Sequence, residues 1–158
     1  VKSNEFQLQG YSDSDWGSSK DRKSIYGYCF SLNNDSSIIS WKSKAQPIVA
    51  LSTCESEYVA LTLAVQESIF LSQLLSDMSC VEKQPVVLNV DNQGCIELAK
   101  NPVFHQRTKH IDIKFHFIRS QIDAEKIILQ YVPTQDNYAD AFTKPLNKIK
   151  LNKFQLCK

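Results

Sequence analysis

Hydrophobic and polar positions in the first part of the chain follow the pattern of a small antiparallel sheet. The stretch Phe6–Asp13 predicts a first strand, and Tyr26–Leu32 is aromatic and β-prone. Residues 33–36, which read NNDS, predict a turn, and Ile38–Lys42 follow as a third short strand. The pattern therefore predicts three consecutive antiparallel strands.

The period then becomes helical. Ser52 and Thr53 are followed by two glutamates, which is typical of a helix start. Apolar residues recur at helical spacing as far as Leu75, which predicts a helix over residues 54–77.

The rest of the chain alternates strands and helices. We expect a buried strand at Val86–Val90, a short helix from Asp91 to Asn101, a helix at Asp112–Ala124 with Ile113, Phe117 and Ile118 on its apolar side, a strand at Ile127–Val132, and a last helix after Pro133. Strands followed by helices at this spacing imply parallel crossovers. The predicted class is α/β, a five-stranded mixed sheet with three antiparallel and then two parallel strands, flanked by helices.

Acidic residues fall where the predicted strands end. Asp13 and Asp15 close the first strand, Asp91 directly follows the fourth, and Asp140 lies soon after the fifth. Ligands of open α/β sheets bind outside the carboxyl ends of strands near a topological switch point. These acids are therefore candidate site residues, although each taken alone also fits a solvated turn or a helix cap.

Two glutamates at the start of the first helix compete as a further candidate. Glu55 and Glu57 are two residues apart, about 200° around a helix, so they cannot face the same way. Glu57 heads the apolar stripe that must pack on the sheet, whereas Glu55 points away from it. A carboxylate on an inward face is costly unless it is paired or holds a metal. Glu57 is therefore the informative residue.

Converging carboxylates predict bound cations. Acids gathered at one edge would repel one another unless divalent ions lie among them, and oxygen ligands without His or Cys suit Mg²⁺ or Mn²⁺ better than zinc. Two such ions are the arrangement that cleaves phosphodiesters. We therefore expect two Mg²⁺ or Mn²⁺ ions.

The amino-acid composition limits the class of protein that this sequence can form. The 158 residues are 42% hydrophobic, as in one globular domain, and the net charge of +1 hides an asymmetry: five lysines and no acid lie in residues 141–158. No unbroken apolar run reaches the ~18 residues of a membrane span, so no membrane is expected. Five cysteines without a C-x-x-C pair predict reduced, mostly buried thiols.

Several stretches of the chain are distinctive in combination: Gly10–Trp16 (GYSDSDW), Ala50–Tyr58 (ALSTCESEY), Asp91–Gln93 (DNQ), Tyr131–Thr134 (YVPT) and Ala139–Leu146 (ADAFTKPL). Together they resemble the ribonuclease H domain of copia-type LTR retrotransposon Pol polyproteins, in order and over residues 10–147. The resemblance implies a ribonuclease H-like fold in residues 1–147, with residues 148–158 as a basic C-terminal tail.

The resemblance also implies the chemistry, which is hydrolysis of the RNA strand of RNA–DNA hybrids. It places the family's four catalytic and metal-binding carboxylates on Asp13, Glu57, Asp91 and Asp140, and it selects Asp13 over Asp15. We expect Asp13 and Asp91 to share both ions, with Glu57 holding one and Asp140 the other. The loop before Asp140 lacks the histidine that many cellular ribonucleases H carry there.

Contacts to the nucleic acid are expected from polar and basic residues. The candidates are Ser14, Arg22, Lys23, Lys44, Asn92, Gln93, Arg107 and Lys109. Groups near the site would read the RNA 2′-hydroxyl across the minor groove, and the basic side chains would hold phosphates. The alternative for each basic residue is that it is an ordinary surface charge in contact with water and does not bind nucleic acid.

The expected partners are the hybrid and a reverse transcriptase domain of the same polyprotein, in the cytoplasm and in virus-like particles. An alternative is a catalytically silent ribonuclease-H-like module that binds nucleic acid and supports the polymerase. A retroviral-type integrase on the same general fold is disfavoured by the positions of the acids.

Overall fold

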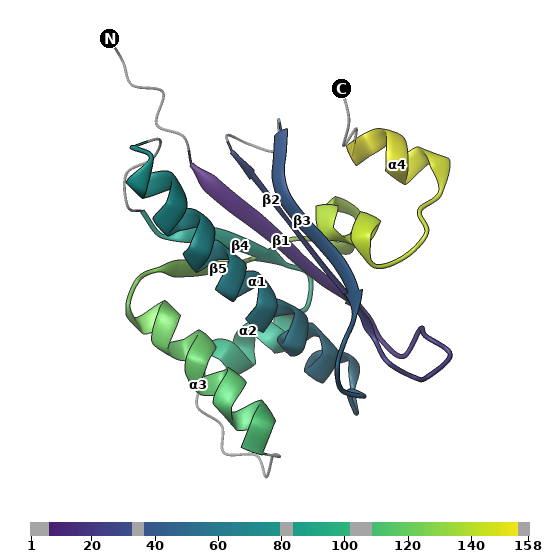
Figure 1. The fold of residues 1–158 in the computed structure, drawn as a ribbon. Helices are drawn as coiled ribbons and strands as arrows, with labels where there is room; N and C mark the ends of the chain where they lie inside the picture. The colour runs from purple at the N-terminus through teal and green to yellow at the C-terminus, as the bar shows by residue number, and fades with distance from the viewer. Residues whose placement is uncertain (1–6, 33–36, 80–83, 102–108, 155–158) are drawn as a thin grey trace.

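A five-stranded sheet is the centre of the described part of the molecule. The computed structural model describes residues 7–32, 37–79, 84–101 and 109–154. The strands are β1 (Leu8–Asp15), β2 (Ile25–Leu32), β3 (Ser37–Ala45), β4 (Val86–Val90) and β5 (Ile127–Tyr131), in the order β3-β2-β1-β4-β5. β1, β2 and β3 pair antiparallel, and β4 is parallel to both β1 and β5. The predicted mixed sheet is confirmed (Figure 1).

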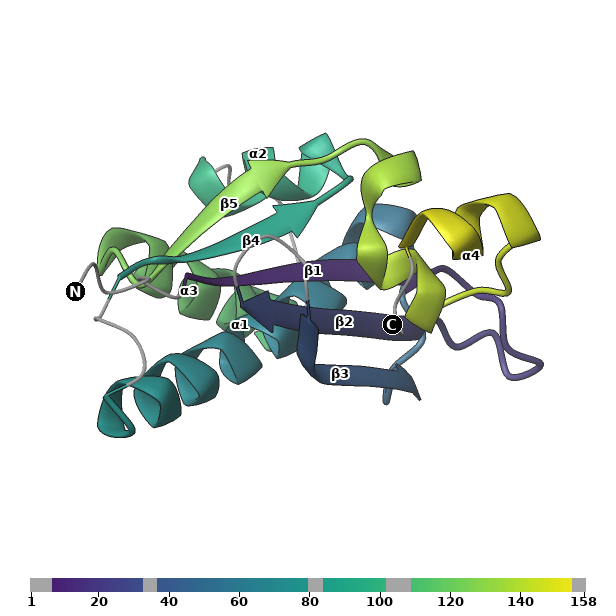
Figure 2. The same ribbon diagram turned by 90° about the horizontal axis from the view of Figure 1, so that it is seen from above.

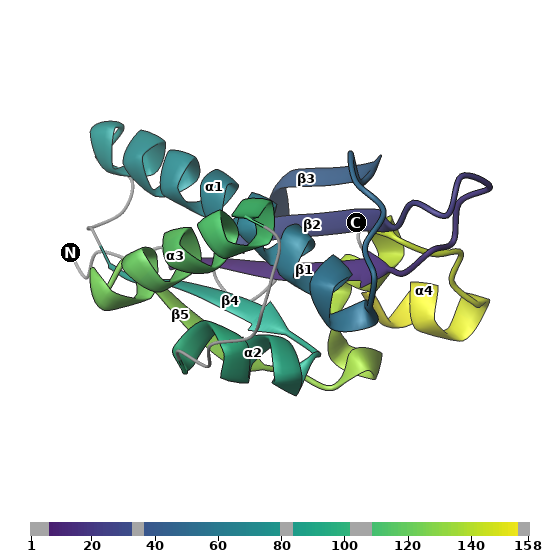
Figure 3. The ribbon, with the colours of Figure 1, turned by 90° about the horizontal axis from the view of Figure 1, so that it is seen from below.

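Helices lie on both faces of the sheet, but unequally. The α-helices are α1 (Thr53–Asp77), α2 (Gln93–Lys100), α3 (Lys109–Asp123) and α4 (Lys148–Phe154), and two 3₁₀ helices are η1 (Thr134–Asp136) and η2 (Tyr138–Phe142). α1, α2 and α3 cover one face, whereas the 3₁₀ helices and α4 lie on the other, beside one end of the central strands (Figures 2 and 3). The predicted elements are thus present, with bounds shifted by up to three residues.

The last predicted helix is not an α-helix. Residues 134–142 form η1 and η2, in which Thr143 donates its backbone N–H to the Asp140 carbonyl oxygen. Asn137 caps η2 at its start, and Pro145 disfavours helical backbone at the residue before it. The few residues between these two limits are too short to nucleate an α-helix.

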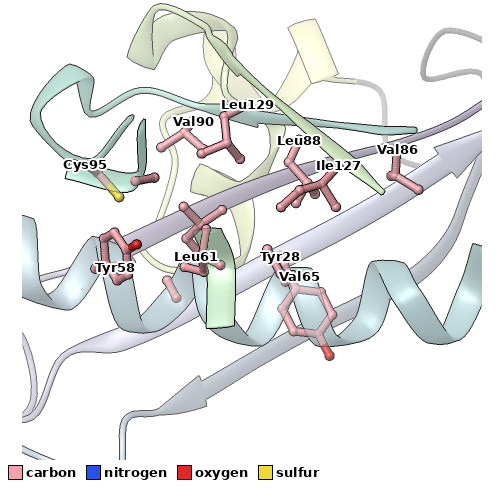
Figure 4. Close-up of a cluster of buried hydrophobic side chains, with 14 of the residues drawn as sticks. Tyr28, Tyr58, Leu61, Val65, Val86, Leu88, Val90, Cys95, Ile127 and Leu129 are labelled. Carbon is pink, nitrogen blue, oxygen red and sulfur yellow. The ribbon is translucent and has the colours of Figure 1, made fainter. Parts of the chain in front are cut away.

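The apolar stripe of α1 packs against the sheet as its period predicts. Leu61, Ala64 and Leu71 are buried together with strand residues such as Leu88, and the side chains from α1, β4 and β5 interdigitate (Figure 4). On α3 the expectation was partly wrong: Ile113 is exposed, and Phe115 is buried against the ring of Tyr58, with ring centroids 3.9 Å apart.

Helix α1 has the length and mean hydropathy, 1.4 over 18 residues, that a membrane span would need. Its burial on the sheet accounts for this composition, because the core helix of a globular domain is selected for the same apolar residues. Among the described cysteines, Cys29 and Cys95 are buried and Cys54 is partly so, all as thiols. Cys80 and Cys157 lie outside the described residues.

Candidate metal centre

Three carboxylates converge at one end of the sheet. Asp13 lies near the end of β1, Glu57 in the second turn of α1, and Asp91 directly after β4. One ligand oxygen from each lies within 4.8 Å of the others. β1 and β4 are parallel neighbours, so their carboxyl ends meet at the same edge, and the start of α1 brings Glu57 to it.

Glu57 is held by the strand that carries Asp13. The Ser14 backbone N–H donates to Glu57 Oε1 at 3.3 Å, and the Ser14 and Ser56 hydroxyls lie 2.7 Å apart in a hydrogen bond. Gln46 Nε2 donates to the Ser56 carbonyl oxygen at 2.8 Å and fixes the same turn of α1. Glu55 instead accepts a hydrogen bond from the Leu51 N–H at the helix start. The two glutamates therefore have separate roles, as the helical geometry predicts.

The site is electrostatically strained. Burial raises the pKa of Glu57 well above its usual value, and the neighbouring Asp13 and Asp91 carboxylates raise it further. Burial also raises the pKa of Asp13, against the opposing effects of the Thr143 hydroxyl and the Lys144 ammonium group. Among the described residues, Glu57 Oε2 is buried and has no hydrogen-bond partner. Glu57 therefore lacks much of the compensation that buried charges ordinarily have.

A divalent cation would supply that compensation. The donors are carboxylate oxygens, which are the ligands of Mg²⁺ and Mn²⁺, and the partnerless Glu57 oxygen is suited to a metal bond. The residues present therefore fit such an ion. Asp13, Glu57 and Asp91 are the side chains that would hold it.

The fourth predicted carboxylate is arranged differently. Asp140 lies in η2, is fully buried, and is outside the group of three. Lys144 Nζ lies 2.7 Å from Asp140 Oδ1 and 3.8 Å from Asp13 Oδ2. Lys150 Nζ from α4 pairs with Asp140 Oδ2 and donates to the Thr134 carbonyl oxygen at 2.9 Å. Asp140 thus adjoins Asp13 through a lysine that both carboxylates contact.

The segment that carries Asp140 is fastened to the central strands. Asn137 is buried, donates to the Ser12 carbonyl oxygen at 3.0 Å and accepts from the Ala139 N–H at 3.1 Å. The Thr143 hydroxyl donates to Asp13 Oδ2. At Gly27, an added Cβ would lie 2.8 Å from Phe142 Cβ, so this close approach of η2 to β2 requires glycine.

The predicted nucleic-acid contacts are placed as follows. Ser14, Tyr26 and Lys44 lie side by side in register across β1, β2 and β3, so Lys44 is about 10 Å from β1, the strand that holds Asp13. Arg22 and Lys23 lie in the loop between β1 and β2, beyond the same end of the sheet.

At the start of α2, Asn92 Oδ1 accepts the Cys95 N–H as the helix cap, and Gln93 is exposed. Arg107 lies outside the described residues, and Lys109 is placed only by its backbone at the start of α3.

Sequence reasoning missed the residues that hold Asp140. Lys144 and Lys150 were counted only as part of a basic segment. The i, i+4 spacing of Asp140 and Lys144 was a usable signal for an ion pair. No local signal identifies Lys150, because its position depends on how α4 folds back. Residues 148–154, expected as part of a tail, form this helix, and its Phe154 ring packs on Tyr138 with centroids 4.7 Å apart.

The chain is similar in sequence to one segment of much longer polyproteins. It is 43% identical over 152 residues to the retrovirus-related Pol polyprotein from transposon TNT 1-94 of Nicotiana tabacum, which covers 96% of this chain and 11% of that protein. It is 38% identical over 154 residues to the corresponding polyprotein from transposon RE2 of Arabidopsis thaliana, covering 97% and 10%. The chain spans about a tenth of the length of these relatives. No family model matches it.

Solved structures show the same fold. LC11-RNase H1, crystallised with an RNA/DNA hybrid, matches with a TM-score of 0.61 and 14% identity, over 87% of this chain and 94% of that one. The N-terminal RNase H domain of rv2228c from Mycobacterium tuberculosis gives 0.60 and 16%, over 94% and 96%. A foamy viral protease-reverse transcriptase, also with an RNA/DNA hybrid, gives 0.54 and 17%, over 87% and 19%.

Proposed function

The chain is homologous to one segment of the Pol polyproteins of copia-type transposons and has the ribonuclease H fold, and we propose that it is a metal-dependent endoribonuclease that hydrolyses the RNA strand of RNA–DNA hybrids. The observation that carries the proposal is the convergence of Asp13, Glu57 and Asp91 at the carboxyl end of the central strands. The partnerless oxygen of Glu57 supports a bound ion there.

Different carboxylates would bind the two ions. Asp13, Glu57 and Asp91 would hold the first ion, and Asp140, beside Asp13, is the remaining carboxylate for a second. Mg²⁺ or Mn²⁺ in such a site activates a water and stabilises the leaving 3′-oxygen. Ser14 keeps Glu57 in place through its N–H, and Thr143 orients Asp13 through its hydroxyl. The chain thus supplies a prearranged set of oxygens.

Polar groups around the carboxylates would recognise the hybrid. Ser14, Asn92 and Gln93 lie beside the cluster in the chain and would face the RNA strand near the 2′-hydroxyl. Arg22, Lys23 and Lys44 lie beyond the same end of the sheet and would hold phosphates. Arg107 and Lys109 remain proposed as further phosphate contacts.

The relatives support a proposal for the setting of the activity. Because they are Pol polyproteins, we place the domain beside a reverse transcriptase of the same polyprotein, acting during reverse transcription. The cytoplasm, and virus-like particles within it, are the proposed location.

A second candidate is a catalytically silent module that binds nucleic acid and supports the polymerase. The specific observation in its favour is the pairing of Asp140 with Lys144 and Lys150, because the two ammonium groups compete with an ion for the carboxylate. Retention of all four carboxylates favours the enzyme.

The deciding experiment is a cleavage assay on the purified 158-residue chain. A hybrid labelled in its RNA strand is incubated with Mg²⁺ or Mn²⁺, beside duplex DNA and duplex RNA. We expect cleavage of the hybrid alone, abolished in Asp91→Asn and unchanged in Asp123→Asn, an exposed residue at the end of α3. Hybrid binding without cleavage supports the silent module, and cleavage that survives Asp91→Asn rules out this site. Repeating the assay with the upstream polymerase region distinguishes an inactive domain from one that needs its neighbour.

A further inference from the structure

Asp140 has contacts that bear on how many ions this site can take. Its two carboxylate oxygens face two different ammonium groups. Oδ2 accepts a hydrogen bond from Lys150, whereas Oδ1 lies 2.7 Å from Lys144 Nζ as an ion pair without a hydrogen bond among the described residues. Asp140 is fully buried, so water does not compete for these positions. An ion that binds Asp140 through Oδ2 must therefore displace Lys150.

The charge balance leads to the same conclusion. Asp13, Glu57, Asp91 and Asp140 with the two lysines carry a formal charge of −2, which one divalent ion neutralises. A second ion would leave an excess of positive charge in a site whose carboxylates are largely buried, and such an excess is costly. Displacement of Lys150 into water removes part of that excess.

Lys150 is suited to leave because α4 is lightly attached. The helix buries Phe154 on Tyr138, whereas Ile149 is 82% exposed and Leu151 51%. Besides Asp140, the Lys150 ammonium contacts the Thr134 carbonyl oxygen and lies 5.6 Å from the centroid of the Phe154 ring. Figure 2 shows α4 at the margin of the molecule, on the face of the sheet away from α1. Few contacts would be broken if α4 moved.

We propose that Lys150, which lies on α4, blocks Asp140 by forming an ion pair with it. The chain then binds one divalent ion at Asp13, Glu57 and Asp91, and it binds a second ion only when Lys150 moves away. The inference rests on the proposed function in that it takes the carboxylates as a metal site. Lys144, which also touches Asp13, keeps the two aspartates together when Lys150 is absent.

The test counts bound Mn²⁺ on the intact chain without nucleic acid, using the electron paramagnetic resonance signal of free Mn²⁺. We expect one bound ion for the wild type over a concentration range in which Lys150→Met binds two, with the second-ion affinity raised about tenfold or more. Lys150→Arg keeps the charge and should bind one ion. Lys148→Met, an exposed lysine on the same helix, is the matched control and should also bind one.

Two further measurements keep the result decisive. If Lys150→Met does not fold, as circular dichroism would reveal, Lys150→Gln removes the same ammonium group with a polar side chain and should likewise bind two ions. A wild type that binds no Mn²⁺ or two ions of equal affinity, or a folded Lys150→Met or Lys150→Gln chain with unchanged binding, overturns the proposal. Failure of the proposed function would be distinct: the one-ion and two-ion pattern would persist without hybrid cleavage.

Discussion

The Ser14 backbone N–H donates to Glu57 Oε1 at 3.3 Å, and Glu57 Oε2 lies buried with no hydrogen-bond partner in the described part of the chain. One oxygen of the carboxylate therefore joins α1 to β1. The other adds a desolvation cost, to which the nearby Asp13 and Asp91 charges add repulsion. In the absence of metal, Glu57 is thus positioned at the expense of stability.

Replacing Glu57 should consequently stabilise the metal-free chain. In Glu57→Gln, the repulsion is removed while the size of the side chain is kept, so we expect the free energy of unfolding to rise by about 1 kcal/mol. For a domain of this size that is roughly 2–4 °C in Tm, measured by circular dichroism in EDTA. Added Mg²⁺ should raise the Tm of the wild type and have little effect on Glu57→Gln.

Glu55 provides the opposite control on the same helix. Glu55→Ala loses the hydrogen bond that the Glu55 carboxylate accepts from the Leu51 N–H at the start of α1, and should lower the free energy of unfolding by about 0.5–1 kcal/mol, with the Mg²⁺ response intact. A Glu57→Gln chain that is destabilised like Glu55→Ala would show that Glu57 has a structural role instead.

Asn137 should be a strong contributor to stability. It is buried and bridges β1 and η2 through the Ser12 carbonyl and the Ala139 N–H. Asn137→Ala leaves both groups without their partner, so we expect a loss of about 2 kcal/mol in urea unfolding. Asn101→Ala, which removes an exposed contact to Glu97, should change stability by no more than about 0.5 kcal/mol. Equal effects of the two substitutions would contradict this role of Asn137.

Gly27 sets the distance between β2 and η2. In Gly27→Ala, the new Cβ would collide with Phe142 and Thr143, so we expect a loss of about 1–3 kcal/mol in urea unfolding and displaced amide resonances around Asp140. Ser43→Ala, at the position paired with Gly27 on β3, adds no atoms and should leave both observables unchanged. A wild-type spectrum for Gly27→Ala would mean that η2 does not need this close approach.

Local periodicity indicated most of the part of the site that regular elements hold. The strand ends indicated Asp91 and the pair Asp13 and Asp15, of which only the family resemblance selected Asp13, and the apolar stripe of the first helix selected Glu57. The ion pairs of Asp140 could not be predicted from the sequence, because one of them forms only when α4 folds back and brings Lys150 to Asp140. Surface lysines follow no periodic pattern that would indicate such a contact. Likewise, which face of α3 is buried depends on where Tyr58 lies, so Phe115 was not recognised as a core residue.

Stability at alkaline pH should depend on Tyr28. Burial raises the pKa of Tyr28 above its usual 10.0. The Glu67 carboxylate accepts a hydrogen bond from the Tyr28 hydroxyl, and its negative charge raises the pKa further. The folded chain therefore keeps this proton at a pH where the unfolded chain loses it. The contribution is fully present below about pH 10 and is lost as pH rises above it.

Tyr28→Phe removes this titration. We expect the free energy of unfolding to fall less steeply between about pH 9 and pH 11 than in the wild type, as measured by urea unfolding. Tyr131→Phe, which alters an exposed tyrosine, should retain the wild-type slope. Identical slopes for the wild type and Tyr28→Phe would show that Tyr28 titrates alike in the folded and unfolded chain.

The basic side chains near the site should make the affinity for the hybrid depend on salt concentration. Each contact to a duplex phosphate steepens the dependence of log affinity on log salt by about 0.9. Arg22→Ala and Lys44→Ala, made in the cleavage-deficient Asp91→Asn background, should each weaken hybrid binding and reduce that slope by about this amount, measured by fluorescence anisotropy. Lys126→Ala, which removes an exposed charge before β5 at the opposite end of the sheet, is the control. If all three substitutions reduce the slope equally, the hybrid is held by the overall charge of the chain and not by this end of the sheet.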